Sequence, residues 1–236
     1  MPFSLESRRV GDIVVIRCAG RLIAGAECEQ LQKHVADAMA FDRNFVVNLG
    51  DVPFIDSSGI GTLVRLLGRT RAAHGNLKLC GVVPHVAQVF KVTNLDRVFE
   101  AHESESDAIT DFYRQRPAAS AGKRGARVLC VHTSADVLAY MREILLAAGY
   151  DPLTASNLLD GKVLLAATRP SLVVISSHLR NLKGTLAADS FHDLSKSVPM
   201  VELNDAFTTD DPGEAANALR SMVAAAIGTH GASAAN

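Results

Sequence analysis

The spacing of apolar positions along the chain predicts two successive sets of alternating strands and helices. In the first half, runs with a two-residue period predict strands, and apolar residues three or four positions apart predict helices. Residues 59–75, for example, place Ile60, Leu63, Val64 and Leu67 on one helical face, which is expected to point inward. The predicted elements are strands at 3–9, 12–19, 45–49, 77–82 and 98–100, and helices at 26–41, 59–75, 84–92 and 104–114. This order predicts an α/β fold with a mixed or parallel sheet covered by helices.

The second half of the chain repeats the alternation. Its predicted strands are 127–131, 153–155, 172–176 and 199–203, and its predicted helices are 135–148, 158–168 and 214–227. The stretch between residues 176 and 199 has no clear period and is expected to be irregular. Such an order is typical of a doubly wound α/β domain.

A change in composition marks the boundary between the two halves. Residues 115–125 are rich in Pro, Ala, Ser, Gly and basic residues and have no apolar period, which is typical of a linker. We therefore expect one domain at 1–114, a linker at 115–125, a second domain at 126–230 and a disordered tail at 231–236.

Charge and hydropathy exclude several classes of protein. The 236 residues carry 24 basic and 25 acidic side chains, for a formal net charge of −1. Because phosphate backbones are bound through an excess of positive charge, a nucleic-acid partner is not expected. No apolar run approaches the roughly 20 residues that span a bilayer, and the N-terminus lacks the apolar segment of a signal peptide. We expect a cytoplasmic protein that does not bind membranes.

The cysteines and histidines suggest no further chemistry. The four cysteines, Cys18, Cys28, Cys80 and Cys130, are scattered and form no C-x-x-C pair, and the eight histidines show no metal-ligand spacing. Disulfides, a metal and a cofactor are therefore not expected.

The segment FIDSSGIG at 54–61 has the clearest chemical potential. It places Ser57 and Ser58 directly after Asp56 at the start of a predicted helix. The free N–H groups and the dipole of a helix start favour negative charge, so a phosphate would be tolerated there. The same residue types also suit ordinary capping by Asp56 or Ser57. A nucleophilic serine is disfavoured, because the G-x-S-x-G elbow is absent and no His is placed as its base. Spacing alone leaves capping and phosphoregulation open.

Several motifs of the first domain occur together, in order and spacing, in a known family. They are VVNLGDV and FIDSSGIG at 46–52 and 54–61, AGRL at 19–22, HGNLKLCG at 74–81 and VFKVTNLDRVF at 89–99. On these motifs, residues 3–114 resemble a STAS domain of the anti-sigma factor antagonist type.

This resemblance implies a non-enzymatic role in partner switching. In that family the antagonist binds an anti-sigma factor that is also a serine kinase of the histidine-kinase-like ATPase type. Phosphorylation of the first hydroxyl residue after the Asp ends the complex, and a PP2C-type phosphatase restores it. Carried onto this chain, the phosphoacceptor is Ser57. Asp56 and Ser58 flank it, and Gly59 and Gly61 would let the partner approach the helix start closely.

One position departs from the family pattern. Antagonists usually carry an acidic residue in the loop after the second strand, near the phosphorylation site. Ile23 holds that place here, which puts phosphorylation in question and suggests instead an apolar contact for a partner.

The second domain resembles a flavodoxin-like response-regulator receiver. The matching segments are AAGYDPLTA at 147–155, RPSLVVIS at 169–176 and VPMVEL at 198–203. The short spacing between Asn204 and the last helix predicts that the fourth helix and fifth strand are reduced or absent.

The functional positions of a receiver are not preserved in this chain. The acidic pair that binds magnesium is replaced by His132 and Thr133, the acceptor Asp by Ser176 and the switch residue by Asn204, and the Lys has no counterpart. Because Mg²⁺ needs carboxylate oxygens and aspartyl phosphate needs an aspartate, we expect these positions to be inactive.

Three hypotheses follow. The first is a partner-switching regulator in which Ser57 is reversibly phosphorylated and the degenerate receiver serves for interaction or homodimerisation. The second is a constitutive STAS scaffold that is not phosphorylated, suggested by Ile23. The third is a small-molecule sensor or enzyme that uses the second domain, where Ser176, Ser177 and His178 lie close in sequence.

Overall fold

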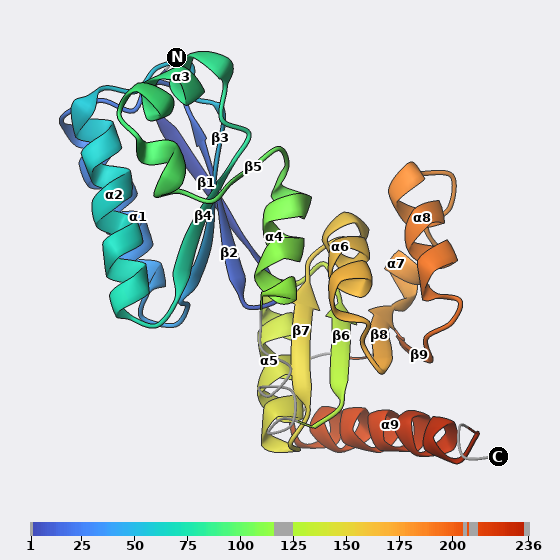
Figure 1. Ribbon diagram of the computed structural model, residues 1–236. Coiled ribbons are helices and arrows are strands. Elements are labelled where there is room, and N and C mark those ends of the chain that lie inside the picture. The colour runs from blue at the N-terminus through green and yellow to red at the C-terminus, as the bar shows by residue number, and fades with distance from the viewer. Residues whose placement is uncertain (1, 116–124, 205–206, 208–211, 234–236) are drawn as a thin grey trace. The chain divides into compact units, whose positions relative to one another are not determined.

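The computed structural model describes residues 2–115, 125–204, 207 and 212–233. It divides into two compact units, Met1–Phe112 and Tyr113–Asn236, each of which has its own sheet (Figure 1). The predicted linker at 115–125 lies largely outside the described residues, so its character stays a prediction.

The first unit contains a five-stranded sheet in the order β1-β2-β3-β4-β5. The strands are β1 (Ser4–Val10), β2 (Ile13–Ala19), β3 (Asn44–Asp51), β4 (Asn76–Cys80) and β5 (Ala101–His102), and the helices are α1 (Ala26–Ala38), α2 (Ser57–Ala72), α3 (Pro84–Val92) and α4 (Glu105–Arg114). β1 pairs antiparallel with β2, and the other neighbouring strands are parallel. The predicted mixed sheet is confirmed.

Side chains of this sheet alternate between two layers of helices. Ile16, Val47 and Leu79 form one row across β2, β3 and β4 and join a core that includes residues of α1, α2 and α3. The next row along, Val46 and Lys78, faces the opposite side. There Lys78 contacts α4, which Figure 1 draws away from the other helices of this unit.

The predicted strand at 98–100 is wrong. The structure has a 3₁₀ turn at Leu95–Arg97 and a two-residue strand, β5, at Ala101–His102. Phe99 is buried in the core and stacks on Phe90, with 5.6 Å between the ring centres. The apolar residues here therefore mark a loop anchored in the core.

Lys78 lies in β4 and is fully buried. Its ammonium group lies 2.6 Å from Glu100 Oε2, pairs with Asp111 of α4, and lies 4.8 Å from the centre of the Phe112 ring. A buried charge is strongly unfavourable unless it is paired and hydrogen-bonded. These contacts therefore hold α4 against the sheet.

The second unit contains a four-stranded, all-parallel sheet in the order β7-β6-β8-β9. The strands are β6 (Arg127–Val131), β7 (Asp151–Ala155), β8 (Leu172–Ser176) and β9 (Met200–Leu203), and the helices are α5 (Ala135–Ala147), α6 (Leu158–Thr168), α7 (Ser177–Asn181), α8 (Leu186–Ser195) and α9 (Pro212–Ser233). Counted within the unit, the order is 2-1-3-4, which is the flavodoxin-like order without its fifth strand. Within the described residues, the expected reduction of the fifth strand is thus observed.

Helices cover both faces of this second sheet. α5 and α9 share one core with Val128 and Cys130 of β6. On the other face α6 packs against α8, where a Cβ at Gly161 would lie 3.1 Å from the Phe191 ring. The predicted doubly wound arrangement is confirmed.

The expectation that residues 177–198 are irregular is wrong. They form α7 and α8, separated by Gly184 with φ of +77°. Ser176 Oγ accepts a hydrogen bond from the N–H of Leu179, and Thr185 Oγ1 accepts one from the N–H of Ala188. Two capping residues thus start two helices. The five residues of α7 are too few to show a clear apolar period, and the buried face of α8 includes a serine at position 195.

The expected disordered tail at 231–236 is partly wrong. α9 continues to Ser233, and residues 234–236 lie outside the described residues.

Replacing Asp111 by alanine should lower the free energy of unfolding of the first unit by about 3 kcal/mol. The change leaves the buried Lys78 with only the partly exposed Glu100 as its carboxylate partner. Urea denaturation of the full chain, with hydrogen exchange of the β4 amides to assign the transition to this unit, measures the effect. Glu103→Ala removes an exposed carboxylate of the same segment and should change stability by less than about 0.5 kcal/mol. Equal effects of the two substitutions would contradict the assigned role of Lys78.

Candidate functional site

The loops that follow β2 and β3 run side by side beyond the edge of the first sheet. Leu22 and Ile55 form a parallel bridge. The N–H of Leu22 donates to Phe54 O at 3.0 Å, and the N–H of Asp56 donates to Leu22 O at 3.2 Å. Because β2 and β3 are parallel neighbours, their carboxyl ends bring both loops to the start of α2.

Asp56 caps α2 and also joins the two loops. One carboxylate oxygen accepts a hydrogen bond from the N–H of Gly59 at 2.8 Å, and the other accepts one from the N–H of Ala24 at 2.9 Å. These bonds, together with the N–H of Ser58 and the charge of Arg21, lower the pKa of Asp56. Asp56 is therefore an anion at neutral pH, and the capping interpretation is confirmed for Asp56.

Ser57 is the first residue of α2 and is exposed. Because Asp56 provides the cap, the Ser57 hydroxyl is not needed for it, and within the described part of the chain this hydroxyl has no hydrogen-bond partner. Ser58 is half-buried. Ser57 is thus the more accessible of the two hydroxyl residues.

The two glycines of the motif differ in what surrounds them. A Cβ at Gly59 would lie 2.4 Å from Leu22 O and 2.7 Å from Ile55 Cγ1, so the chain itself fills this space. A Cβ at Gly61 would meet only Arg65 Nη1, at 3.6 Å. The close approach at Gly59 is made by the chain's own loops, and only Gly61 leaves room for another molecule.

Apolar side chains are partly exposed on α2 and on the loops that precede it. Val64 of α2 and Phe54 of the preceding loop are each 37% exposed, and Ile23 is half-buried. The guanidinium of Arg21 lies 4.7 Å from the centre of the Phe54 ring. Val64 was predicted to point inward and does not.

The inward face of α2 is formed instead by Leu63, Leu66 and Leu67, all of which are buried. The apolar period alone cannot distinguish Val64 from this face. Val64 lies three positions before the buried Leu67, which is the spacing expected of two residues on the same helical face. Exposure in the folded unit identifies the apolar surface beside Ser57.

Comparison with known proteins assigns this unit. Residues 4–108 match the family model of the STAS domain. Residues 4–108 form a STAS domain. A relative from Bordetella bronchiseptica named as a candidate anti-sigma factor antagonist, BtrV, is 28% identical over 107 residues, which is 45% of this chain and 92% of the relative.

Two solved structures are also similar to the STAS domain. A candidate anti-sigma factor antagonist from Thermotoga maritima has 24% identity and a TM-score of 0.43, and the match covers 45% of this chain and 92% of that one. The phosphorylated form of SpoIIAA from Bacillus has 26% identity and a TM-score of 0.39, covering 47% of this chain and 99% of that one. At these TM-scores the structural likeness carries no weight of its own, and the assignment rests on the family model. The match to the STAS family model ends at residue 108, before the second unit begins.

In the second unit, three of the expected degenerate positions lie at one edge of the sheet. His132 follows β6, Ser176 ends β8 and Asn204 follows β9, and these strands are parallel neighbours. Ser176 is buried and its hydroxyl caps α7. Thr133 and Asn204 are exposed.

His132 is half-buried beside the first turn of α5. Burial lowers its pKa, and its Nδ1 accepts a hydrogen bond from the N–H of Ser134 at 3.0 Å. A lowered pKa favours the neutral imidazole at physiological pH. At this edge of the second sheet, none of the four degenerate receiver positions supplies a carboxylate. That these positions are inactive toward magnesium and phosphate stays a prediction.

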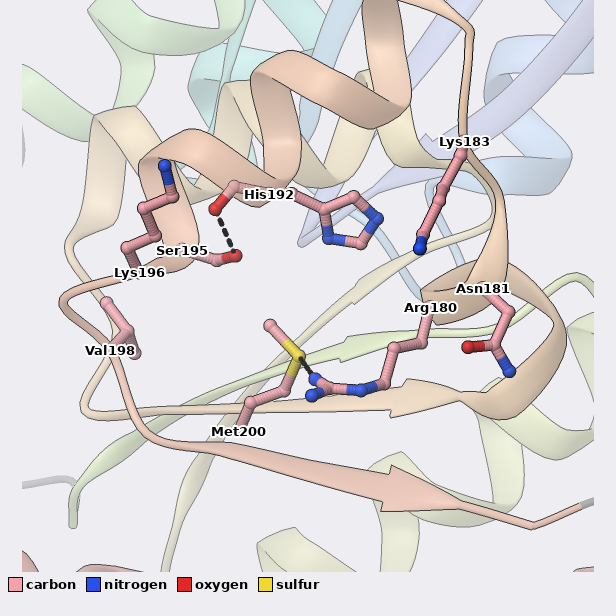
Figure 2. A pocket seen from close by; sticks show the side chains of 8 residues that line it. All are labelled: Arg180, Asn181, Lys183, His192, Ser195, Lys196, Val198 and Met200. Carbon is pink, nitrogen blue, oxygen red and sulfur yellow. Dashed lines mark hydrogen bonds between the residues drawn. The ribbon is translucent and has the colours of Figure 1, made fainter.

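A pocket of about 520 Å³ lies elsewhere in the second unit, between α7, α8 and β9 (Figure 2). Sequence reasoning missed it, because residues 177–198 were expected to be irregular.

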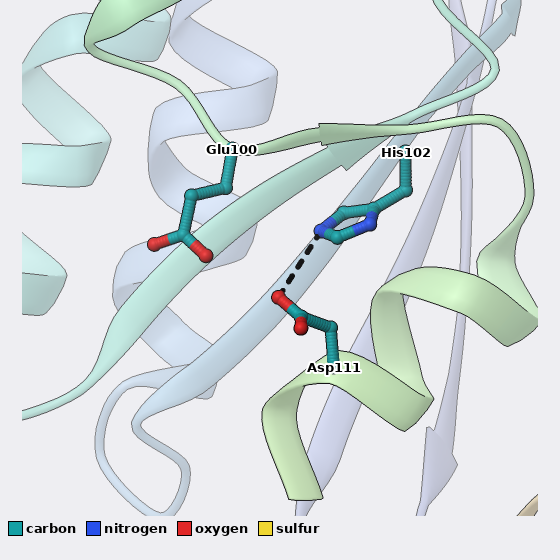
Figure 3. A group of neighbouring side chains, drawn as sticks. All are labelled: Glu100, His102 and Asp111. Atoms are coloured by element: carbon teal, nitrogen blue, oxygen red, sulfur yellow. Dashed lines mark ion pairs between the residues drawn. The ribbon is translucent and has the colours of Figure 1, made fainter. Parts of the chain in front are cut away.

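One group of side chains in the first unit has the residue types of a metal site. The ligand atoms of Glu100, His102 and Asp111 lie within 4.8 Å of one another (Figure 3). The ammonium group of Lys78 already binds both carboxylates and offsets part of their charge. A divalent cation would have to displace this buried lysine, so we interpret the group as a structural ion-pair network.

The cysteine thiols are not suited to metal binding or nucleophilic chemistry. All four are free and buried. Burial raises the pKa of Cys18, Cys80 and Cys130 to about 12 in each case, so these thiols stay protonated at neutral pH.

Among the described helices, none has the length and apolar character to cross a membrane.

Gly59→Ala should lower the free energy of unfolding of the STAS domain by about 1–3 kcal/mol. The added methyl group would lie within 3 Å of the backbone oxygen of Leu22, and the loops or the helix start would have to move. Gly68→Ala in the same helix is the matched control, because its Cβ meets nothing within 4 Å. This control should raise stability by up to about 1 kcal/mol. Thermal unfolding of both variants measures the difference, and a neutral Gly59→Ala would contradict the close packing of the two loops.

Proposed function

We propose that this protein is a regulator in a partner-switching pathway. Its STAS domain binds an anti-sigma factor that is also a serine kinase of the histidine-kinase-like ATPase type, and this kinase phosphorylates Ser57. A PP2C-type phosphatase reverses the modification. The chain itself acts in the cytoplasm without catalysing a reaction. The observation that carries the proposal is the exposed hydroxyl of Ser57, which Asp56 leaves unused at the start of α2.

The charge around Ser57 supports its use as a switch. A phosphate adds about −1.5 to −2 charge, directly beside the Asp56 carboxylate. That carboxylate already accepts the N–H groups of Gly59 and Ala24, two of the donors that could otherwise compensate a second anion. A phosphate on Ser57 is therefore stabilised mainly by water, and a partner that covers it would remove this hydration.

The apolar surface beside Ser57 supports a protein partner. Phe54 precedes the helix start and Val64 lies two turns into α2; both are partly exposed, and Ile23 lies in the adjoining loop. Apolar contacts of this kind favour association while Ser57 is unmodified, and the added charge opposes it.

The alternative is a STAS scaffold that binds its partner constitutively. It is favoured by Ile23, which occupies the place of an acidic residue in the loop that Asp56 ties to α2. The alternative predicts the same surface but no phosphate on Ser57.

Phosphate should be found on Ser57 when the full chain is isolated from its own cells. Localisation by mass spectrometry should show the modification in the wild type and in Ser58→Ala, and its loss in Ser57→Ala. Phosphate on Ser58, or none under any growth condition, favours the constitutive scaffold.

Phosphorylation should also weaken the complex with the kinase by roughly 30-fold or more. An unpaired buried interface charge costs about 2–5 kcal/mol, and each 1.4 kcal/mol is tenfold in affinity. Titration calorimetry of the phosphorylated and unmodified chains measures the ratio, with Ser58→Ala as the control that binds like the wild type. Equal affinities of phosphorylated and unmodified protein would contradict the switch.

We propose further that the second unit is a receiver-like domain that has lost its phosphoryl chemistry and serves for interaction or homodimerisation. Support comes from the strand order and from Ser176, whose hydroxyl is buried and capping a helix.

The second unit should therefore not accept phosphate from a small donor. Incubation of the full chain with acetyl phosphate and Mg²⁺ should leave its mass unchanged, because the edge of the sheet offers no aspartate at Ser176 and no acidic pair at His132 and Thr133. Intact-mass measurement checks this. A gain of one phosphate that disappears in Ser176→Ala would show an active site that this interpretation excludes.

A further inference from the structure

The pocket of the second unit is lined by basic side chains. Its lining residues are Arg180, Asn181, Lys183, His192, Ser195, Lys196, Val198 and Met200. No acidic side chain occurs among them, although the chain as a whole carries slightly more acidic than basic residues. Its volume of about 520 Å³ is in the range of small-molecule sites.

The cations of the pocket differ in how far they are already neutralised. Arg180 Nε pairs with Glu202 Oε2 at 3.0 Å, and Lys196 pairs with Asp193 at 2.8 Å. Within the described part of the chain, Lys183 has no ion-pair partner. Lys183 is therefore the side chain whose charge is most available to a ligand.

The side chains are also directed differently. In Figure 2 the ammonium group of Lys183 and the ring of His192 point into one space above the guanidinium of Arg180, whereas the ammonium of Lys196 points away. His192 Nε2 lies 3.3 Å from Leu182 O, which orients the ring. Arg180 rests on Met200 and is further held by Glu202. Lys183, in the loop after α7, and His192, on α8, thus face the same volume, and the guanidinium of Arg180 on α7 lies below it.

We propose that this pocket binds the phosphate group of a small organic phosphate. A lysine ammonium offers three N–H donors and a guanidinium a fixed fork, and these approach the volume from different directions. A tetrahedral phosphate with several acceptor oxygens can accept from all of them, whereas a planar carboxylate accepts mainly in its own plane. Val198 and Met200 supply an apolar wall for the organic part of the ligand. This inference does not depend on the proposed role of Ser57.

Inorganic phosphate serves as the probe for the site. Amide shifts of the full, isotope-labelled chain are followed at constant pH and ionic strength as phosphate replaces chloride. We expect saturable shifts confined to residues 180–183 and 192–200, and weaker ones with acetate. Shifts spread over both units, no saturation, or equal binding of acetate would overturn the proposal.

Two lysine variants sharpen this test. Lys183→Ala should weaken phosphate binding roughly tenfold, since a charge-assisted hydrogen bond contributes about that factor. Lys162→Ala on α6 removes the same charge from the same unit outside the pocket lining and should leave the affinity unchanged. Lys183 is exposed, so its removal should not affect folding, which an unchanged thermal midpoint verifies. Equal losses in both variants would indicate only a general effect of charge and would also overturn the proposal.

Discussion

One carboxylate holds the start of α2 and the loop after β2 together. Asp56 accepts a hydrogen bond from each, through the N–H groups of Gly59 and Ala24. The bridge between Leu22 and Ile55 and the tight packing of Gly59 depend on the same alignment of the two loops. Because an aspartate performs the capping, the serine that follows it has no structural duty and remains at the surface.

The same kind of helix start has the opposite result in the second unit. Ser176 ends the parallel strand β8 and caps α7, whereas in the STAS domain a loop separates the end of β3 at Asp51 from the cap residue Asp56. With no aspartate before it, Ser176 caps α7 with its own hydroxyl and is buried. A serine that caps is held by the backbone, whereas a serine after a capping aspartate is free to react with an enzyme from outside. This difference supports placing the switch in the first unit.

Buried charge in the STAS domain has a structural use. Lys78 is buried in β4 and fixes α4 through Asp111 on the face opposite α1, α2 and α3. Two of the three potential metal ligands around it, Glu100 and Asp111, are engaged by the same lysine. The basic side chains of the second unit are different, because Lys183 is exposed and lies at an open pocket.

The sequence by itself determined the order of most strands and helices, the two-part organisation and the position of the hydroxyl motif, because apolar period, turn residues and capping residues are local properties. Local patterns could not separate Val64 from the buried face of α2, place Phe99 in the core, or reveal α7, which has only five residues, and α8, whose buried face includes a serine. Nor could they show that Asp56 binds Ala24, that Lys78 reaches Asp111, or that Lys183, His192 and Met200 line one pocket. These relations join residues that only the packing of the sheet and helices brings together, and tertiary structure alone decides them.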